Sequence, residues 1–445
     1  MQPYSPQRRT ALVLCGTGAH GAYHAGVLRA LQESGVKIDV MAGHGVGVGA
    51  AALAAIDGAA RLWEADGIWR SAEVRTWYRW KWPLRAAGWF GAVLVAVLVA
   101  PLLLPVFGLR PTVEPFVVAA LIVIATLVLA SAASVIAAQR RSRGRRKVEG
   151  AWWWRILAAP FGAEPAREAF AAALWQLIRG AANVARPASQ ALGHRYAEVL
   201  ADSLGQPGFR ELMIVATDLD ARHDVVGALL GEPYRNAFMA PRPGRERHAE
   251  AFDLADGGQD HAFDLVSAGL TPPLGCDPFL MSFPVESYWR GETHRVCDRP
   301  GAIVRLLEEL AAVGVSQAIV VSAVPPPPSP HRLSASRLEI RHRLGEVLAA
   351  AESSALRDAI EMARLRFDSV YLIRPHHNPV GGFDVGGAYD EASDRQHGLE
   401  ELMDGAYEDA YQQFIEPVVG ASGEQIARVG ARRAPRGEPQ SEPMI

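Results

Sequence analysis

Gly43-His44-Gly45-Val46-Gly47 lies between an apolar run at residues 36–42 and a small-residue stretch at residues 48–56. This order matches the G-x-S-x-G elbow, in which a strand turns sharply into a helix and lifts a serine hydroxyl above the sheet. Gly45 stands at the serine position. The flanking pattern therefore predicts an α/β fold with a sharp turn at residue 45. Because glycine has no side chain that can attack a carbonyl, the same stretch predicts an elbow without its nucleophile.

A glycine-rich loop precedes this elbow. Gly16-Thr17-Gly18-Ala19-His20-Gly21 lies between an apolar run at residues 11–15 and a helical stretch at residues 22–34. Its G-x-G-x-x-G spacing also occurs in dinucleotide sites, where an acidic residue ends the second strand. Asp39 instead lies near the start of that strand, and the elbow occupies its end. We therefore expect the backbone N–H groups of Gly16, Thr17, Gly18, Ala19 and Gly21 to bind an oxyanion or another anion.

The remaining pattern continues the alternation of strands and helices, which is typical of an α/β domain. Helices are predicted at residues 167–184, 195–204, 302–313 and 398–414, and strands at residues 211–217, 317–323 and 369–373.

Composition excludes several classes of function. The 445 residues carry a formal net charge of −3 at pH 7, so no basic surface for nucleic acid is expected. Cys15, Cys276 and Cys297 are too few and too scattered for a disulfide framework or a metal-spaced cluster. We therefore predict no metal, no cofactor and a reducing, cytosol-facing compartment.

Two segments indicate a membrane protein. Residues 86–107 and 116–138 contain no charged side chain. Each matches the roughly 20 apolar residues that cross the hydrocarbon core of a bilayer. A short turn separates them, so they predict a transmembrane helical hairpin with the lipid bilayer as a partner. The alternative is a buried helix pair inside a soluble core.

The charges around this hairpin predict its orientation. Four basic residues precede it, six follow it between positions 140 and 147, and the turn has Arg110 alone. Since basic residues stay in the cytoplasm, we expect a multi-pass protein of the cytoplasmic (inner) membrane with both termini cytoplasmic. Tryptophans also cluster at both flanks, as in an interfacial aromatic belt: Trp77, Trp80, Trp82, Trp89, Trp152, Trp153 and Trp154.

Several of these stretches resemble the patatin-like phospholipases. The similarity lies in the glycine loop, in Gly26-Val27-Leu28-Arg29-Ala30-Leu31, in Ile38 to Gly43, in Ala216-Thr217-Asp218-Leu219, in Val266-Ser267-Ala268-Gly269-Leu270, in Tyr288-Trp289-Arg290-Gly291 and in Ala318 to Ser322. It covers residues 10–75 and roughly 205–325. The resemblance implies a three-layer α/β/α sandwich and acyl-ester cleavage by a Ser-Asp dyad.

The predicted domain organisation follows from this resemblance. Residues 10–75 form the first part of a patatin-like domain, and residues 76–147 form the inserted hairpin, with helices at about 86–107 and 116–138. Residues 148–420 complete the domain. Residues 421–445 are expected to be a disordered tail.

Carried over to this chain, the dyad is missing at both positions. The serine position is Gly45, and the Tyr-x-Asp-Gly-Gly pattern places Arg290 at the aspartate position. Arginine cannot act as a general base at neutral pH. Asp256-Gly257-Gly258 lies upstream of the segment that precedes the catalytic turn, so we interpret it as a surface loop. His20 replaces the basic residue that the family carries in the glycine loop.

The sequence therefore favours a catalytically impaired or inactive member that binds lipid or a protein partner. His20, His44 and Arg290 are the candidate ligand contacts, and a fatty-acid carboxylate or a phospholipid phosphate is the candidate ligand. One alternative is an active lipid acyl hydrolase with a rearranged site or an aspartate elsewhere. Another is a membrane assembly or transport component whose α/β domain is a cytosolic scaffold. The oligomeric state is not predicted.

Overall fold

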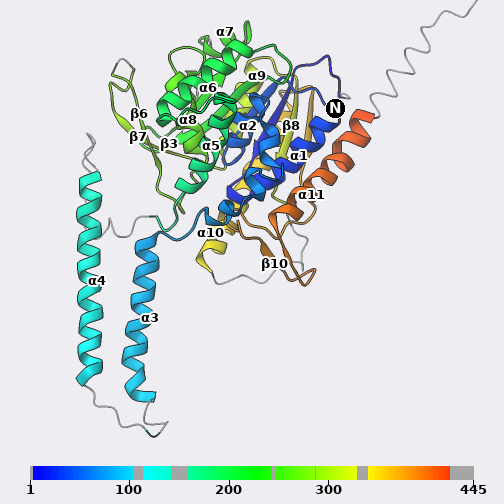
Figure 1. The fold of residues 1–445 in the computed structure, drawn as a ribbon. Coiled ribbons are helices and arrows are strands. Elements are labelled where there is room, and N and C mark those ends of the chain that lie inside the picture. Colours follow the sequence, from blue (N-terminus) through cyan, green and yellow to red (C-terminus); the bar gives the residue numbers. More distant parts are fainter. Residues whose placement is uncertain are drawn as a thin grey trace, which may run out of the picture.

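The computed structural model describes residues 4–103, 108, 114–141, 159–242, 247–285, 287–327 and 339–420. Within these residues, an α/β domain carries two long helices that extend from it side by side (Figure 1). The predicted tail at residues 421–445 and most of the predicted hairpin turn lie outside the described residues.

A mixed, mainly parallel sheet forms the centre of the domain. Its strand order is β5-β4-β3-β2-β1-β8-β9, with β7 paired to β3 and β6 paired to β7. The strands are β1 (Thr10–Cys15), β2 (Val40–Gly43), β3 (Glu211–Asp218), β4 (His223–Leu229), β5 (Ala249–Asp253), β6 (Phe279–Ser282), β7 (Thr293–Cys297), β8 (Gln317–Ser322) and β9 (Ser369–Ile373). The pairings β1–β2, β1–β8, β2–β3, β8–β9 and β4–β5 are parallel, whereas β3 runs antiparallel to β4 and β7. A separate pair, β10 (Ala388–Asp390) and β11 (Arg395–His397), follows β9.

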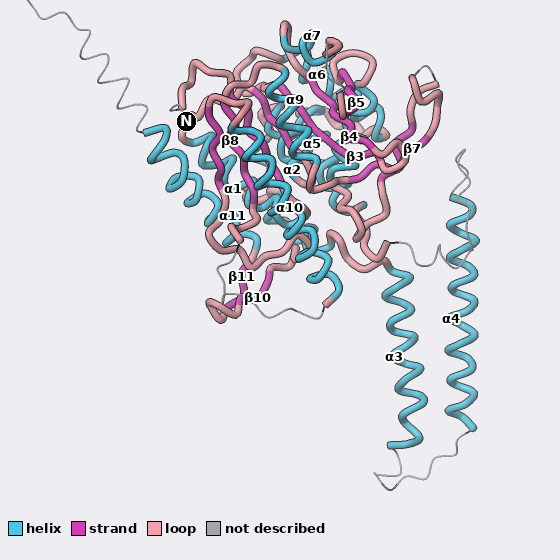
Figure 2. Tube along the Cα trace, turned by 180° about the vertical axis from the view of Figure 1, so that it is seen from behind, coloured by secondary structure: helices cyan, strands magenta, loops and turns pink. Residues whose placement is uncertain are grey.

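Helices cover both faces of this sheet, so the domain has three layers (Figure 2). On one face, the apolar side chains of the sheet pack against α1 (Gly21–Glu33), α2 (Gly47–Ala55), α5 (Glu164–Arg179), α6 (Ser189–Ser203), α8 (Ala262–Gly269) and α11 (Leu399–Ala410). On the other face they pack against α7 (Tyr234–Met239), α9 (Ala302–Ala312) and α10 (Ile340–Arg364). A π-helix at Tyr411–Gly420 continues α11. This is the α/β/α arrangement expected from the sequence.

Strand β1 shows why the sequence folds in this way. Its six residues are all buried. Leu12 and Leu14 join the cluster on one face, while Val13 and Cys15 join the cluster on the other. A run that is apolar at every position, and not only at alternate ones, therefore matches a central strand covered on both faces. The carboxyl ends of β1 and β2 bring the glycine loop and the elbow to the same edge of the sheet.

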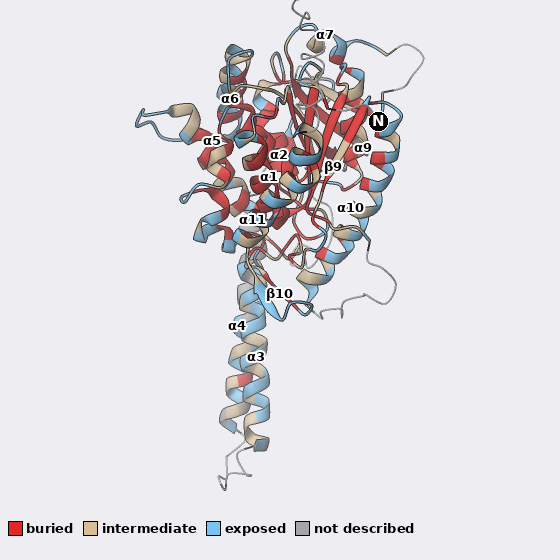
Figure 3. Ribbon diagram, turned by 90° about the vertical axis from the view of Figure 1, so that its right-hand side faces the viewer, coloured by how far each residue is buried: buried red, intermediate tan, exposed pale blue. Residues whose placement is uncertain are grey.

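Two long helices lie side by side where the sequence predicts the hairpin. They are α3 (Trp82–Leu103) and α4 (Glu114–Arg141), and the buried core of the domain does not extend along them (Figure 3). Their exposed apolar side chains include Trp89, Val95 and Leu98 on α3 and Leu121, Ile122 and Leu129 on α4. The segment Leu84–Pro101 has the length and hydropathy of a membrane span, while the apolar stretch Phe116–Thr126 in α4 is shorter. A membrane crossing by both helices stays a prediction.

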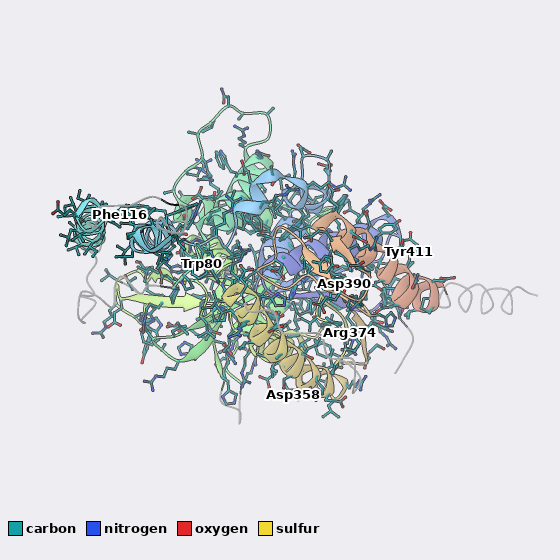
Figure 4. The ribbon with its side chains drawn as sticks, turned by 90° about the horizontal axis from the view of Figure 1, so that it is seen from below. Trp80, Phe116, Asp358, Arg374, Asp390 and Tyr411 are labelled. Carbon is teal, nitrogen blue, oxygen red and sulfur yellow. The ribbon has the colours of Figure 1, made fainter. Side chains whose placement is uncertain are left out.

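The chain enters α3 through an aromatic cluster that belongs to the domain. Trp77 packs against Trp69 and Phe170, and the Trp80 ring lies 5.2 Å from Phe161. Seen from below, Trp80 lies between α3 and the domain, whereas Phe116 lies out on α4 (Figure 4). Trp77 is therefore a core residue and no part of the predicted aromatic belt, whereas Trp82 and Trp89 are exposed. Trp152, Trp153 and Trp154 lie outside the described residues.

Candidate functional site

The elbow occurs where the sequence predicts it. Gly45 follows β2, precedes α2 and has a φ of +60°. A Cβ atom at this position would overlap the carbonyl oxygen of Gly16. That carbonyl accepts a hydrogen bond from the Val46 N–H at 2.8 Å, so the glycine loop is fastened against the turn. The backbone angle at residue 45 therefore favours glycine, and the surrounding atoms leave no space for a side chain.

Gly43 and Gly47, two residues before and two residues after Gly45, also lie close to backbone carbonyl groups. A Cβ atom at Gly43 would lie 2.6 Å from the Gly47 carbonyl carbon, and one at Gly47 would lie equally close to the Leu14 carbonyl carbon. Val46 is buried beside them. The frame of the elbow is thus retained and tightly packed although the nucleophile is absent.

Asp298, and not Arg290, lies beside the nucleophile position. The Oδ2 atom of Asp298 is 3.0 Å from where a Cβ atom at Gly45 would lie. Asp298 directly follows β7 and is 1% exposed, and its N–H donates to the Thr271 carbonyl at 3.0 Å. A buried acidic side chain therefore lies beside position 45, where the sequence predicted none.

The prediction for Arg290 is accordingly wrong. Arg290 lies in the connection between β6 and β7, is exposed, has a φ of +45° and donates its N–H to the Ser287 carbonyl. The Tyr288-Trp289-Arg290-Gly291 stretch forms this turn, and β7 then returns the chain to the sheet edge. Asp256, in contrast, is exposed just beyond β5, as expected of a surface loop.

Asp298 was not predicted from the sequence, because the family's motif is Asp-Gly-Gly and Asp298 is followed by Arg299 and Pro300. A usable signal was present in Val296-Cys297-Asp298 followed by Arg299-Pro300-Gly301. An acidic residue that ends an apolar strand just before a proline-glycine turn lies at a sheet edge.

His44 has become the partner of the retained acid. Its Nδ1–H donates to Asp298 Oδ1 at 3.3 Å, and both side chains are 1% exposed. Burial alone would lower the pKa of His44, but hydrogen bonds with Asp298 and Cys15 raise this pKa well above its ordinary value. Burial raises the pKa of Asp298, and the bond with His44 opposes that rise. The hydrogen bond therefore favours the protonated imidazole of His44 and the ionised carboxylate of Asp298.

Asp298 keeps one oxygen unbonded. Its Oδ2 atom, which faces Gly45, has no hydrogen-bond partner among the described residues. This is the oxygen that would meet a hydroxyl at position 45. Position 45 thus has a buried histidine–aspartate pair beside it and no side chain of its own.

Three donors of the predicted anion-binding loop are already bonded within the protein. The Ala19 N–H donates to the Gly382 carbonyl at 2.7 Å, and a Cβ atom at Gly18 would overlap that same oxygen. The Thr17 N–H points to His20 Nδ1 at 3.5 Å, and the Gly21 N–H donates to carbonyls of its own turn. An anion that bound to these three N–H groups would have to displace the internal acceptors.

A buried polar cluster surrounds the loop, and the sequence analysis identified only its His20 member. Glu352 on α10 accepts a hydrogen bond from the Thr17 hydroxyl at 3.3 Å and lies 3.5 Å from His20 Nδ1. His24 donates from Nε2 to the Cys15 carbonyl at 2.9 Å. Burial lowers the pKa of His24 to about 4 and raises that of the Cys15 thiol.

The helical spacing around Glu352 could have predicted that this side chain is buried. Leu348, Glu352, Leu356 and Ala359 occupy one buried face of α10, so an acidic residue stands in an apolar stripe. In the described part of the chain, no group of three or more histidine, cysteine or acidic side chains is arranged to hold a metal ion.

Comparison with known proteins gives one family and a distant structural likeness. The family model for patatin-like phospholipase matches residues 12–152. That span contains the glycine loop and the elbow and ends before Asp298. No curated protein matches. Among solved structures, the chain is similar to that of VipD from Legionella pneumophila, with 12% identity and a TM-score of 0.31, covering 91% of this chain and 66% of the VipD chain.

Proposed function

We propose that the chain is a membrane-anchored patatin-fold protein that does not hydrolyse acyl esters and that binds a lipid or a protein partner instead. The match of residues 12–152 to the family model for patatin-like phospholipase supports the fold in this proposal. The observation that carries this proposal is the elbow itself. Gly45 has no nucleophile and no room for one, since a Cβ atom there would overlap the Gly16 carbonyl.

The second requirement of acyl transfer is restricted. A tetrahedral intermediate needs N–H donors aimed at its oxyanion. The Ala19 N–H is bonded to Gly382, the Thr17 N–H points to His20, and the Gly21 N–H bonds within its own turn. Covalent chemistry thus lacks its nucleophile, and three of the predicted oxyanion donors are already engaged.

The retained Asp298 is the one observation that favours the alternative, an active hydrolase with a rearranged site. Its partner, however, is His44, which carries no hydroxyl and holds the carboxylate in place. An acid without a nucleophile cannot form an acyl-enzyme. We therefore keep the alternative as an outcome of the activity test.

The proposed lipid ligand follows from the family and from the hairpin. Helix α3 is long and apolar enough to cross a bilayer, and the chain enters it directly from the domain at Trp80 and Trp82. A site at the root of such an anchor lies close to acyl chains and headgroups. Arg290 is exposed on the β6–β7 connection and has no role in this proposal.

Activity-based labelling tests the loss of catalysis. A fluorophosphonate probe reacts with activated serine hydroxyls, so the purified full-length protein should remain unlabelled. Hydrolysis of a short-chain ester should not exceed that of the heat-denatured protein. A patatin-type serine hydrolase added to the same detergent sample is the positive control. Stoichiometric labelling of this chain, or ester turnover that disappears with denaturation, would establish the active alternative.

Cysteine labelling tests the membrane topology. All three native cysteines are buried, so maleimide labelling of an introduced cysteine can be distinguished from labelling of the native ones. Thr112→Cys should react with a membrane-impermeant maleimide in intact cells, because the turn is expected outside the cytoplasm. Arg75→Cys and Ser142→Cys, on the two flanks, should react only after permeabilisation. Thr112 and Ser142 lie outside the described residues. Protection of Thr112→Cys in intact cells, or extraction of the protein without detergent, would contradict the hairpin.

A further inference from the structure

The residue that closes the glycine loop comes from the far end of the chain. Residues 380–385, here called the strap, lie between β9 and β10. The Gly382 carbonyl accepts the Ala19 N–H at 2.7 Å. A peptide carbonyl presents the same acceptor as an ester carbonyl or a carboxylate oxygen. The strap thus places its own oxygen where an acyl ligand would place one.

Side chains hold the strap in this position. Phe383 is 1% exposed and its ring lies 5.7 Å from that of Tyr78 and 5.3 Å from that of Phe161. Arg341 on α10 donates to the Phe383 carbonyl at 2.7 Å. Asp384 accepts the Gly381 N–H at 3.1 Å. The strap is therefore docked by apolar packing and by defined hydrogen bonds.

Helix α10 holds the strap and the loop together. It contributes Arg341 to the strap, and Glu352 to Thr17 and His20. His342 on the same helix lies 3.4 Å from Asp384. The start of α10 and the β10–β11 pair lie at the end of the domain from which α3 leaves (Figure 1). The strap is thus near the root of the membrane hairpin.

Tyr78 connects helix α3 to both the glycine loop and the strap. It is fully buried four residues before α3 begins, and its φ is +50°. Its Cε2 atom is 3.2 Å from where a Cβ atom at Gly18 would lie, and its ring packs edge-on against Phe383. Its hydroxyl donates to the Leu270 carbonyl at 3.0 Å. One ring therefore touches the glycine loop and the strap at the point where the chain leaves for the membrane.

We propose that the strap is an internal ligand of the glycine loop, and that Tyr78 couples its release to the position of helix α3. In the docked state, Gly382 satisfies the Ala19 N–H and excludes other acceptors. In the released state, that N–H donates instead to an acyl carbonyl or carboxylate oxygen of a ligand. Such a ligand shifts the balance only through its preference for the released state. The identity of the displacing ligand rests on the proposed lipid-binding function, whereas the docking of the strap does not.

Hydrogen exchange of the full-length protein in lipid nanodiscs tests the strap. The peptide that contains residues 17–22 reports the Ala19 N–H, and peptides from β1 and β8 report global folding. Phe383→Ala removes the ring that holds the strap, so exchange at Ala19 should rise by at least about tenfold while β1 and β8 stay protected. Phe238→Ala is the matched control, since Phe238 is also 1% exposed but lies on the other face of the sheet. Unchanged exchange at Ala19 in Phe383→Ala, or an equal rise in Phe238→Ala, would overturn the internal-ligand proposal.

A second variant tests the coupling to α3. Tyr78→Leu keeps an apolar side chain but loses the ring contact with Phe383. Exchange at Ala19 should rise as in Phe383→Ala, and transfer of the wild-type protein from nanodiscs to detergent should change exchange at Ala19 more than in Tyr78→Leu. Equal responses of the two proteins to that transfer would remove Tyr78 from the proposal.

Oleate distinguishes this inference from the proposed function. Added to the wild-type protein, oleate should increase exchange in the strap while the peptide of residues 17–22 stays protected, because the carboxylate replaces Gly382. If Phe383→Ala releases the strap but oleate changes neither peptide in either protein, the fatty-acid ligand is wrong and the internal ligand stands.

Discussion

Gly45→Ala is expected to destabilise the protein by about 2–5 kcal/mol. The φ of +60° costs an alanine roughly 1–2 kcal/mol. Overlap of the new Cβ atom with the Gly16 carbonyl adds about 1–3 kcal/mol, because the packed turn has to shift. Chemical denaturation in mild detergent, followed by tryptophan fluorescence, measures the loss.

Gly35 provides the matched control for this change. It has a φ of +63°, but a Cβ atom there would meet no atom within 4 Å. Gly35→Ala should therefore lose only the backbone part, about 1–2 kcal/mol. If the two variants lose the same free energy of unfolding, the crowding at the elbow is not real.

The same crowding bears on attempts to restore catalysis. Gly45→Ser would place a hydroxyl next to Asp298, and no change at Arg290 is needed to supply an acid. The serine Cβ atom would nevertheless collide with the Gly16 carbonyl, and the Ala19 N–H would still be bonded to Gly382. Position 45 and the strap would have to change together.

His44→Ala is expected to cost about 3–5 kcal/mol, because it leaves the Asp298 carboxylate buried without its charged partner. The same substitution in the Asp298→Asn background should cost clearly less, since no buried charge is then stranded. The exposed Arg29–Glu33 pair is the control, and Arg29→Ala should cost below about 1 kcal/mol. Equal costs of His44→Ala in the two backgrounds would contradict the pairing.

The pH dependence of this defect has a definite sign. Burial raises the pKa of Asp298 in the folded state. A carboxyl group with a raised folded-state pKa favours folding when it is protonated, and that contribution is lost as the pH rises through the folded-state pKa. Without His44 the carboxyl keeps the burial that raises its pKa and loses the bond that opposes the rise. The defect of His44→Ala should therefore shrink at acidic pH, where Asp298 is protonated, and shrink again as the pH rises through the raised pKa of His44, where the wild-type pair loses its own charge partner.

Local signals were sufficient for the part of the site that is contiguous in sequence. The apolar run of β1, the glycine loop and the elbow lie within the first 56 residues, and each has a short-range pattern that predicted its structure. β2 is shorter than predicted, covering Val40–Gly43 and not residues 36–42. Gly35, with its positive φ, ends α1, and the Val36 N–H still bonds back to that helix, so the strand begins later.

The rest of the site depends on contacts between distant segments. Asp298 reaches the elbow because it follows β7, and Gly382 reaches the glycine loop because the strap returns to the same sheet edge. β4 to β7 were not predicted, and β6 and β7 are joined through a turn that resembled the catalytic motif. Arg290 was misplaced for this reason. The sequence around a single acidic residue in a helix, such as Glu352, does not indicate which distant residue it contacts.

The order of synthesis gives the central position of β1 a further consequence. β1 pairs with β2 on one side, but its other neighbour is β8, and the bonded residues Thr10 and Gln317 are 307 positions apart. In the proposed membrane topology, the ribosome therefore delivers the hairpin to the bilayer long before β8 is synthesised. During that interval, an apolar strand edge with unpaired backbone groups is held at the bilayer surface. Closure of the sheet by β8 then competes kinetically with association between this strand edge and neighbouring chains. In the same topology, tethering of the first strands to the membrane limits which chains they can contact.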